Sequence, residues 1–368
     1  MLIKPFRAVY PNLDFVASAD SFVDAVKEQY QEYCNKGFFQ KAPQEALYVY
    51  QIRTSRRNFT GLIACANIKD FFEGKIKKHE NTIAEGEQTQ MQLLISRGAA
   101  VKPVLQAYRD VPEINQLFDE IIATHEVFFK MFFEKSKEEH LFWQISDGAT
   151  IQKIQELFSE KIPFTYIADG HHRTTTTALL YERMKEKKKA KAFDYLLTVY
   201  FPSSQLEIFA FNRLIEGLGE LSMTAFMAKI SQVCDIEQLQ QPTKPSKKHQ
   251  MIMYLNREWY RLTWKESVVS TFDTKSVLLD VSLLNEKILK DIFGIVNVRS
   301  DERVLYIEGP KGWEGLRSKM ARQDSVAFYL HPVKLEDLMH IADEGKTLPP
   351  KSTWFEPRIK NGLVIYEF

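Results

Sequence analysis

The sequence predicts a mixed α/β protein (an α+β mixed sheet) of two domains. The first observation is length, because 368 residues exceed what one ordinary hydrophobic core holds. The second is the order of patterns over residues 1–200. Segments with apolar residues at helical spacing are followed by segments in which apolar and polar residues alternate, as in strands. Strand patterns dominate residues 201–368, which predicts a second, strand-rich α+β domain and a boundary near residue 200.

Helical spacing is first seen at residues 20–34, where apolar residues recur at steps of three and four: Phe22, Val23, Val26 and Tyr30. Gly37 follows, and glycine suits the left-handed backbone just past a helix. Two alternating segments then predict strands at residues 46–52 and 59–66, joined as a hairpin by a polar turn.

The rest of the first domain alternates between the two patterns. A short helix or turn is predicted at residues 70–74, longer helices at 82–96, 112–133, 147–159 and 174–189, and strands at 104–108, 141–145 and 164–168. The lysine-rich residues 185–191 are interpreted as the solvated end of a helix rather than a nucleic-acid patch, because basic side chains suit the negative end of the helix dipole.

Strand patterns on either side of the predicted boundary predict another hairpin, at residues 195–200 and 206–211. The elements expected after it are a polar excursion at 242–248, a strand at 259–264, a helix at 282–293 and a closing strand at 363–366.

Composition limits the classes of function. Lys and Arg total 49 against 48 Asp and Glu, so the net charge of +1 gives no global attraction for nucleic acid or an anionic membrane. No apolar run approaches the roughly 20 residues of a membrane span, and the amino terminus lacks a signal-peptide pattern. Three scattered cysteines suit a reducing compartment. We therefore expect a cytoplasmic protein without nucleic-acid or membrane partners.

Chemistry is expected at a strand–turn–helix junction, Asp169-Gly170-His171-His172-Arg173. The first N–H groups of a helix lack intrahelical partners and lie at the positive end of its dipole, an arrangement that binds phosphate. Gly170 lets the backbone approach a ligand, Arg173 offers a planar pair of donors, and the two histidines add further donors. Asp169 can cap the helix or hold Mg²⁺.

An ordinary turn is the alternative interpretation, because Asp-Gly pairs and Asp caps are common in turns. Two adjacent histidines and an arginine after an apolar strand are harder to explain in that way, so we interpret the segment as functional. A metal site built on His171 and His172 is disfavoured, because neighbouring side chains point in different directions and no ligand cluster follows.

A second candidate is the segment Lys77-Lys78-His79-Glu80, which precedes a predicted helix. A glutamate at a helix start suits the dipole, and that role alone would explain it. A buried glutamate near bound phosphate also supplies a general base to a hydroxyl nucleophile. His79 and Glu80 are therefore the candidate catalytic residues.

Several motifs together resemble the family named domain of unknown function 1015. They lie at residues 5–7, 74–80, 102–104 (Lys-Pro-Val), 167–173 and 349–358, with Gly362-Leu363 after the last. The resemblance spans nearly the whole chain. Residues 12–19 depart from the Pro-Tyr-Asp segment that is usual in the family.

The central part is also similar to the ParB/sulfiredoxin-like fold, in which a turn before a helix binds nucleotide phosphates. Sulfiredoxins carry a reactive cysteine where this chain has His171, and partition proteins carry a DNA-binding domain where this chain is strand-rich. The free serine kinases have both a His-Glu segment and an Asp-Gly-His-His-Arg turn. By that resemblance Glu80 would deprotonate the serine hydroxyl, and residues 169–173 would hold the nucleotide, ATP or ADP, and the transferred phosphoryl group.

Two further segments carry side chains suited to an anion. Lys351, Ser352 and Thr353 stand between prolines and aromatics, as either a structural plug or binders of a substrate phosphate or carboxylate. Arg56 and Arg57 could bind similarly from their hairpin, although a solvated turn explains them better.

The resulting prediction is an enzyme, a phosphotransferase acting on a small hydroxylated metabolite, free serine or phosphoserine, with a nucleotide and magnesium. The alternative is a nucleotide-responsive binding or regulatory protein of the same fold that turns over no amino acid. A nuclease would need a denser acidic cluster or a basic groove than the sequence contains.

Overall fold

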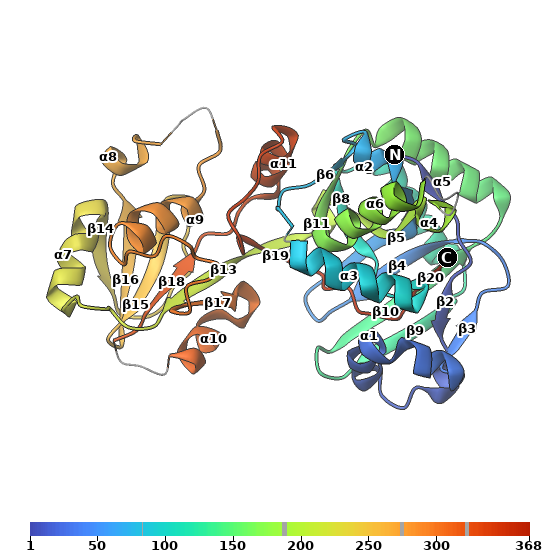
Figure 1. The fold of residues 1–368 in the computed structure, drawn as a ribbon, viewed down its shortest axis with the longest axis horizontal. Coiled ribbons are helices and arrows are strands. Elements are labelled where there is room, and N and C mark those ends of the chain that lie inside the picture. The colour runs from blue at the N-terminus through green and yellow to red at the C-terminus, as the bar shows by residue number, and fades with distance from the viewer. Residues whose placement is uncertain (83, 186–189, 273–275, 321–323) are drawn as a thin grey trace. The chain divides into compact units, whose positions relative to one another are not determined.

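The computed structural model describes residues 1–82, 84–185, 190–272, 276–320 and 324–368. The chain forms two compact units (Figure 1). Unit 1 consists of Met1–Glu207 and Pro357–Phe368, and unit 2 of Ile208–Glu356. The predicted boundary at residue 200 therefore falls within unit 1, and the C-terminal segment Pro357–Phe368 groups with unit 1 instead of with the rest of the predicted second domain.

The main sheet of unit 1 is mixed, in the order β6-β11-β8-β12-β5-β4-β10-β9, with β1 beside β5. Its strands are β1 (Ile3–Lys4), β4 (Leu47–Arg53), β5 (Asn58–Asn67), β6 (Ile76–Lys77), β8 (Val104–Tyr108), β9 (Phe129–Phe133), β10 (Glu138–Ile145), β11 (Thr165–Asp169) and β12 (Tyr195–Pro202). The pairs β6–β11 and β8–β12 are parallel, and the other neighbours are antiparallel. This confirms the predicted mixed α/β class and the β4–β5 hairpin.

The helices and smaller elements of unit 1 surround this sheet. They are α1 (Ala19–Asn35), α2 (Lys69–Phe72), α3 (Ala84–Arg97), α4 (Pro112–Thr124), α5 (Gly148–Lys161), α6 (His171–Lys185), the short 3-10 turns η1 (Leu13–Phe15), η2 (Ala190–Phe193) and η3 (Ser203–Gln205), and the strand pairs β2 (Val9–Pro11) with β3 (Phe39–Lys41) and β7 (Ala99–Ala100) with β20 (Tyr366–Glu367). Figure 1 shows α3 lying alongside α6, and these two helices pack together.

Both faces of the main sheet are buried, and β4 shows why. Leu47 and Val49 face one core, which also contains apolar side chains from α4, α5 and α6. Tyr48 and Tyr50 point to the opposite face, where Tyr50 stacks on Phe142 at 4.6 Å between ring centroids. Side chains alternate along a strand, so a strand buried on both faces reads as a nearly continuous apolar run.

The first predicted helix is confirmed with its buried face. Ser18 caps α1 by accepting a hydrogen bond from the Ser21 N–H, and the buried residues of this helix are Phe22, Val23, Val26 and Tyr30. Gly37 adopts the expected left-handed backbone, with φ of +78°.

The helix predicted over residues 112–133 is wrong in its second half. The helix α4 ends at Thr124, and β9 follows. In β9 the buried residues Phe129, Met131 and Phe133 alternate with Lys130 and Phe132, which are exposed. That period of two belongs to a strand, and it was hidden among apolar residues that also fit helical spacing.

The hairpin predicted from residues 195–200 and 206–211 is also wrong, although both segments are strands. Antiparallel β5 and parallel β8 flank β12 in the sheet of unit 1, whereas β13 (Glu207–Ile215) pairs with strands of unit 2. A central strand has no free edge for its sequence neighbour, so the chain continues through η3 into the other sheet.

Unit 2 contains an antiparallel sheet in the order β14-β16-β15-β18-β13-β17, with β19 beside β13. Its strands besides β13 are β14 (Cys234–Leu239), β15 (Gln250–Leu255), β16 (Glu258–Trp264), β17 (Val304–Glu308), β18 (Val326–Leu330) and β19 (Thr353–Glu356). Its helices are α7 (Met223–Val233), α8 (Glu266–Val269), α9 (Asp280–Leu283), the π-helical η4 (Leu284–Lys290), the 3-10 turn η5 (Gly309–Lys311), α10 (Gly312–Lys319) and α11 (Leu335–Asp343).

Residues 186–189 of the lysine-rich run lie outside the described residues. Within the described ranges, none of the helices combines the length and the apolar character that crossing a bilayer requires.

Candidate functional site

Strand pairing places the two predicted site segments at one edge of the main sheet. Because β6 and β11 are parallel, with Tyr166 opposite Lys77, the residues 78–80 that follow β6 lie beside the end of β11. The antiparallel strand β8 has Leu105 opposite Asp169, so the residues that precede β8 lie at the same edge.

Gly170 forms the turn between β11 and α6. Its φ is +110°, and a Cβ at this position would lie 2.7 Å from Nη2 of Arg173. A side chain would therefore meet both backbone strain and a steric clash. The helix begins at His171, three residues before the predicted start at Thr174, and the Thr174 N–H donates to the Gly170 carbonyl at 3.0 Å.

Asp169 lies among cations from three separate segments. Its carboxylate is 2.8 Å from Nη2 of Arg173 on α6, 3.3 Å from Nζ of Lys102 before β8, and 3.9 Å from Nη1 of Arg358 in the C-terminal segment. These described partners bring three positive charges to one negative charge. The excess is positive, and an anion with several oxygens would balance it.

The pKa shifts of this cluster follow from its burial and its charge. Burial raises the pKa of the Asp169 carboxyl, but Arg173, Lys102 and Arg358 outweigh it, so the net shift is far downward and the group stays ionised. Burial lowers the pKa of Lys102 to about 8; Asp169 opposes this shift, and the two arginines add to it. Lys102 is thus close to losing its charge just above neutral pH.

Asp169 does not fit direct coordination of Mg²⁺, because its oxygens already face cations. In the part of the chain that the structure describes, no group of three or more His, Cys, Asp or Glu side chains could hold a metal ion. An anionic ligand fits better. Within the described ranges, Nε of Arg173 is a buried donor without a hydrogen-bond partner.

His79, Glu80 and His171 meet beside this cluster. The His79 N–H donates to Nε2 of His171 at 3.4 Å, which leaves the ring proton of a neutral His171 on Nδ1. That Nδ1 lies 3.7 Å from Oε2 of Glu80. The rings of His79 and His171 stand edge to face, with centroids 4.4 Å apart.

Both of these histidines are held neutral. Burial lowers the pKa of His171 to about 3; Asp169 opposes this shift, whereas His172, Arg173 and Lys78 add to it. Burial, with a contribution from His171, also lowers the pKa of His79 well below its ordinary value. A neutral His171 can donate through Nδ1 without adding a charge.

His172 packs against α3. A Cβ on Gly86 would lie 3.0 Å from Cε1 of the His172 ring, so the glycine leaves room for the imidazole against the helix backbone. A glycine inside a helix costs stability, and this close approach explains its presence.

The C-terminal segment that carries Arg358 is anchored by three contacts of the residues that follow it. Nζ of Lys360 lies 2.9 Å from Oε2 of Glu138, the Gly362 N–H donates to the Val101 carbonyl at 2.7 Å, and the Phe368 N–H donates to the Gly98 carbonyl at 3.1 Å. The segment is thus hydrogen-bonded to the residues on either side of β7.

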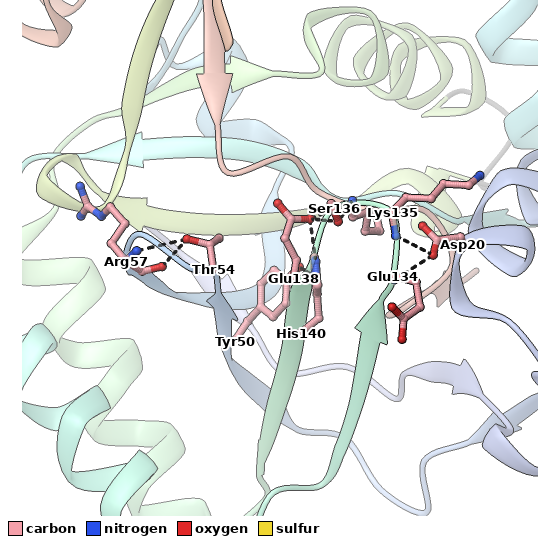
Figure 2. A network of polar contacts seen from close by, with 10 residues as sticks. Asp20, Tyr50, Thr54, Arg57, Glu134, Lys135, Ser136, Glu138 and His140 are labelled. Carbon is pink, nitrogen blue, oxygen red and sulfur yellow. Dashed lines mark hydrogen bonds and ion pairs between the residues drawn. The ribbon is translucent and has the colours of Figure 1, made fainter. Parts of the chain in front are cut away.

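Glu138 belongs to a polar network that runs from the exposed Ser136 to the buried His140 and Tyr50, and Figure 2 shows it from close by. Its Oε2 accepts from the Ser136 hydroxyl at 2.7 Å and lies 3.6 Å from Nε2 of His140, whose Nδ1 is 2.5 Å from the Tyr50 hydroxyl. Although burial raises the pKa of Glu138, hydrogen bonds from these groups and from Lys360 lower it to about 2. Glu138 is therefore ionised at neutral pH, where it can hold Lys360.

A cavity of about 270 Å³ lies in unit 1, next to the Asp169 cluster. Lys102 and Arg173 line its polar side, together with Thr176 and Thr177 of α6. Its lining also includes apolar and aromatic side chains from α3, β8, η2, β12 and the C-terminal segment: Leu93, Leu94, Val104, Phe193, Leu197 and Phe368.

Lys351, Ser352 and Thr353 belong to unit 2, where Lys351 lies over the Phe211 ring at 5.5 Å and the Ser352 hydroxyl donates to the Pro349 carbonyl at 2.5 Å. Their predicted part in substrate binding stays a prediction.

Arg56 and Arg57 lie in the β4–β5 turn and are engaged with Glu207, at 3.8 and 3.5 Å. These ion pairs agree with the interpretation of the segment as an ordinary turn.

Sequence reasoning did not place Lys102, Arg358 or Gly86 in the site. Lys102 and Arg358 both lie within motifs that resemble those of the family, at residues 102–104 and 349–358, and this position could have indicated them as site residues. For Gly86 the signal was a glycine within a predicted helix.

The chain is a mixed α/β protein in which a glycine turn at the start of a helix brings three cationic side chains around the Asp169 carboxylate. The family model described as "Protein of unknown function (DUF1015)" matches residues 6–282, and the chain belongs to that family. No curated protein matches the chain.

Solved structures show distant similarity. A free serine kinase in complex with AMP is 11% identical, covering 80% of this chain and 86% of its own, with a TM-score of 0.37. C-terminally truncated SbnI from Staphylococcus aureus is 10% identical, covering 80% and 82%, with a TM-score of 0.39. A conserved hypothetical protein from Pyrococcus furiosus is 9% identical, covering 81% and 94%, with a TM-score of 0.36.

Proposed function

We propose that this protein is a cytoplasmic phosphotransferase that moves a phosphoryl group between a nucleotide, ATP or ADP, and the hydroxyl of free serine. The proposal assigns unit 1 to the ParB/sulfiredoxin-like fold. The observation that carries it is the position of Glu80. Its carboxylate lies 3.7 Å from His171, the first residue of the helix at whose start Arg173, Lys102 and Arg358 surround Asp169.

Such an arrangement supplies what phosphoryl transfer requires. The reaction needs positioned phosphates, positive charge near the transferred group and a base for the attacking hydroxyl. The helix start, Arg173, Lys102 and Arg358 provide the positive charge, and Glu80 provides the base.

In the forward direction the serine oxygen forms a bond to the terminal phosphorus of the nucleotide. The bond from that phosphorus to its bridging oxygen breaks, and the oxygen leaves on the shortened nucleotide. The serine proton passes to the Glu80 carboxylate. The neutral His171 presents its Nδ1 3.7 Å from this carboxylate and would orient it on ligand binding. The reverse reaction uses the same groups with phosphoserine as donor.

Magnesium would enter with the nucleotide phosphates, because the Asp169 carboxylate faces protein cations. In unit 2, Lys351, Ser352 and Thr353 remain candidate binders of the substrate phosphate or carboxylate.

Isotope exchange between labelled serine and phosphoserine tests the proposal, run with magnesium and with ATP, ADP or pyrophosphate in turn. We expect exchange with one nucleotide, and a fall of about 10²- to 10⁴-fold in Glu80→Gln, the range typical of losing a general base. The control is Glu73→Gln, which removes an exposed carboxylate paired with Lys75.

Nucleotide binding to Glu80→Gln should persist, since the cations are untouched. Full exchange in this variant would remove Glu80 from the mechanism. Nucleotide binding without exchange for any donor would instead support a nucleotide-responsive binding protein.

A further inference from the structure

The cavity beside the Asp169 cluster is not used by the chemistry described above. Along the edge of the sheet, it lies on the opposite side of the Asp169 cluster from Glu80. The strand order is β6, β11, β8, β12. Glu80 follows β6, Asp169 ends β11, Lys102 precedes β8, and the cavity extends to Leu197 of β12. The Asp169 cluster therefore lies between the proposed base, Glu80, on one side and the cavity on the other.

The cavity combines a cationic side with an apolar wall. Lys102 and Arg173 belong both to its lining and to the anion cluster, so a ligand phosphate held there would lie at the cavity's polar side. Lys27 and Arg97 are also part of the lining, and no acidic side chain is among the described lining residues. An anionic ligand is favoured over a cation.

The apolar wall indicates what else the ligand carries. Phe193 and Phe368 both line the cavity, and their ring centroids are 5.1 Å apart. Aromatic side chains of this kind stack on flat heterocycles. Gln90 and Asn361 add amides that can hydrogen-bond to a base edge. At about 270 Å³, the cavity is close to the roughly 300 Å³ at which small-molecule pockets begin.

We infer that this cavity binds the base and sugar of the nucleotide whose phosphates the Asp169 cluster holds. The inference rests on the proposed function, and it adds an orientation to it. The nucleoside lies on the β12 side, the phosphates lie at the turn, and the hydroxyl substrate reaches the terminal phosphate from the Glu80 side.

Calorimetric titration of the full chain with two probes, ADP and inorganic pyrophosphate, tests this orientation. Both carry a diphosphate, but only ADP carries a nucleoside. We expect ADP to bind at least tenfold more tightly than pyrophosphate, because base stacking adds to the shared phosphate contacts.

The variant Leu94→Trp places a larger ring in the cavity from α3, where Leu94 is partly buried. Its matched control is Ile95→Trp, which adds the same ring at the next residue, 51% exposed. We expect Leu94→Trp to weaken the affinity for ADP at least tenfold and to leave the affinity for pyrophosphate within about twofold of the wild type. Ile95→Trp should change neither affinity. Retained pyrophosphate binding shows that the variant is folded.

Equal affinity of the wild-type protein for ADP and pyrophosphate would overturn the inference while leaving the anion site in place. Unchanged ADP affinity in Leu94→Trp would do the same. Failure of both probes to bind would overturn the inference and the proposed phosphotransfer together. A further outcome is that Leu94→Trp loses affinity for ADP alone while the wild type shows no serine exchange. That result would support the cavity as the nucleoside site and would reject only the proposed phosphotransfer.

Discussion

Nη1 of Arg358 lies 3.9 Å from Oδ1 of Asp169 and joins the C-terminal segment to the turn before α6. Unit 2 separates these residues in sequence, yet both belong to unit 1. The positive excess around Asp169 therefore depends on a residue that no local pattern near the turn predicts.

Replacing Arg358 with alanine should weaken pyrophosphate binding about tenfold, the effect of roughly 1.4 kcal/mol, because a charged donor next to the anion is lost. Arg358→Lys should recover part of that loss by restoring the charge without the planar fork. Titration calorimetry measures both. Arg261→Ala, which breaks an ion pair with Glu237 at 2.6 Å in unit 2, is the control. Equal affinity in Arg358→Ala and the wild type would exclude Arg358 from the anion site.

Anion binding should weaken as the pH rises through about 8. Burial depresses the pKa of Lys102 to about 8, so its positive charge is present below that pH and is lost above it. The affinity for pyrophosphate, measured from pH 6.5 to 10, should therefore decline above pH 8 by up to tenfold per unit.

Lys102→Arg provides the comparison, because an arginine keeps its charge throughout this range. Titration of the ligand itself affects both proteins equally. An identical decline in Lys102→Arg and the wild type would contradict the assignment to Lys102.

Mild acid should destabilise the fold through His171. The folded-state pKa of about 3 lies below the ordinary 6.5, so the unfolded chain takes up a proton that the folded chain does not. The stability is fully present above pH 6.5 and is lost as the pH falls toward 3. Between pH 7 and 5 this one group accounts for about 2 kcal/mol.

Denaturant unfolding of the wild type and His171→Asn, followed from pH 8 to 5, measures this effect. The quantity compared is the slope of the free energy of unfolding against pH, so a constant structural cost of the substitution cancels. We expect this slope to be shallower in His171→Asn than in the wild type. Parallel curves would show that His171 does not titrate differently on folding.

Gly170→Ala should destabilise the protein and disturb the pair between Arg173 and Asp169. The positive φ costs about 1–3 kcal/mol for a residue with a side chain, and the added methyl meets the Arg173 guanidinium at 2.7 Å. Thermal unfolding and pyrophosphate titration report the two effects. Gly148→Ala is the matched control, since its Cβ has open space at the start of α5. A Gly170→Ala protein as stable as this control would refute the conformational requirement.

Local patterns predicted the elements that depend on neighbouring residues. The four buried residues of α1 follow helical spacing, and β8 matches its predicted bounds of 104–108. The strand–turn–helix around Gly170 was predicted for the same reason, because the glycine and the apolar strand lie next to each other in sequence.

Long-range pairing explains what the sequence did not predict. Strand β9 was hidden because its phenylalanines also fit a helix, and only the partner β10 selects the strand. Both β12 and β13 were predicted as strands from their own residues, but the sheet that each joins depends on distant strands. In the candidate site, Lys102 and Arg358 come to Asp169 through strand order and through the returning C-terminal segment.

The return of Pro357–Phe368 to unit 1 has a consequence for biosynthesis. A ribosome makes the chain from its amino end, and domains generally fold in that order. Asp169 and Arg173 leave the exit tunnel early, whereas Arg358 follows only after unit 2 has been translated. Until Arg358 has been made, a nascent chain therefore lacks one of the three cations around Asp169. If these cations hold phosphate as proposed, the complete set would form only after unit 2 has been translated.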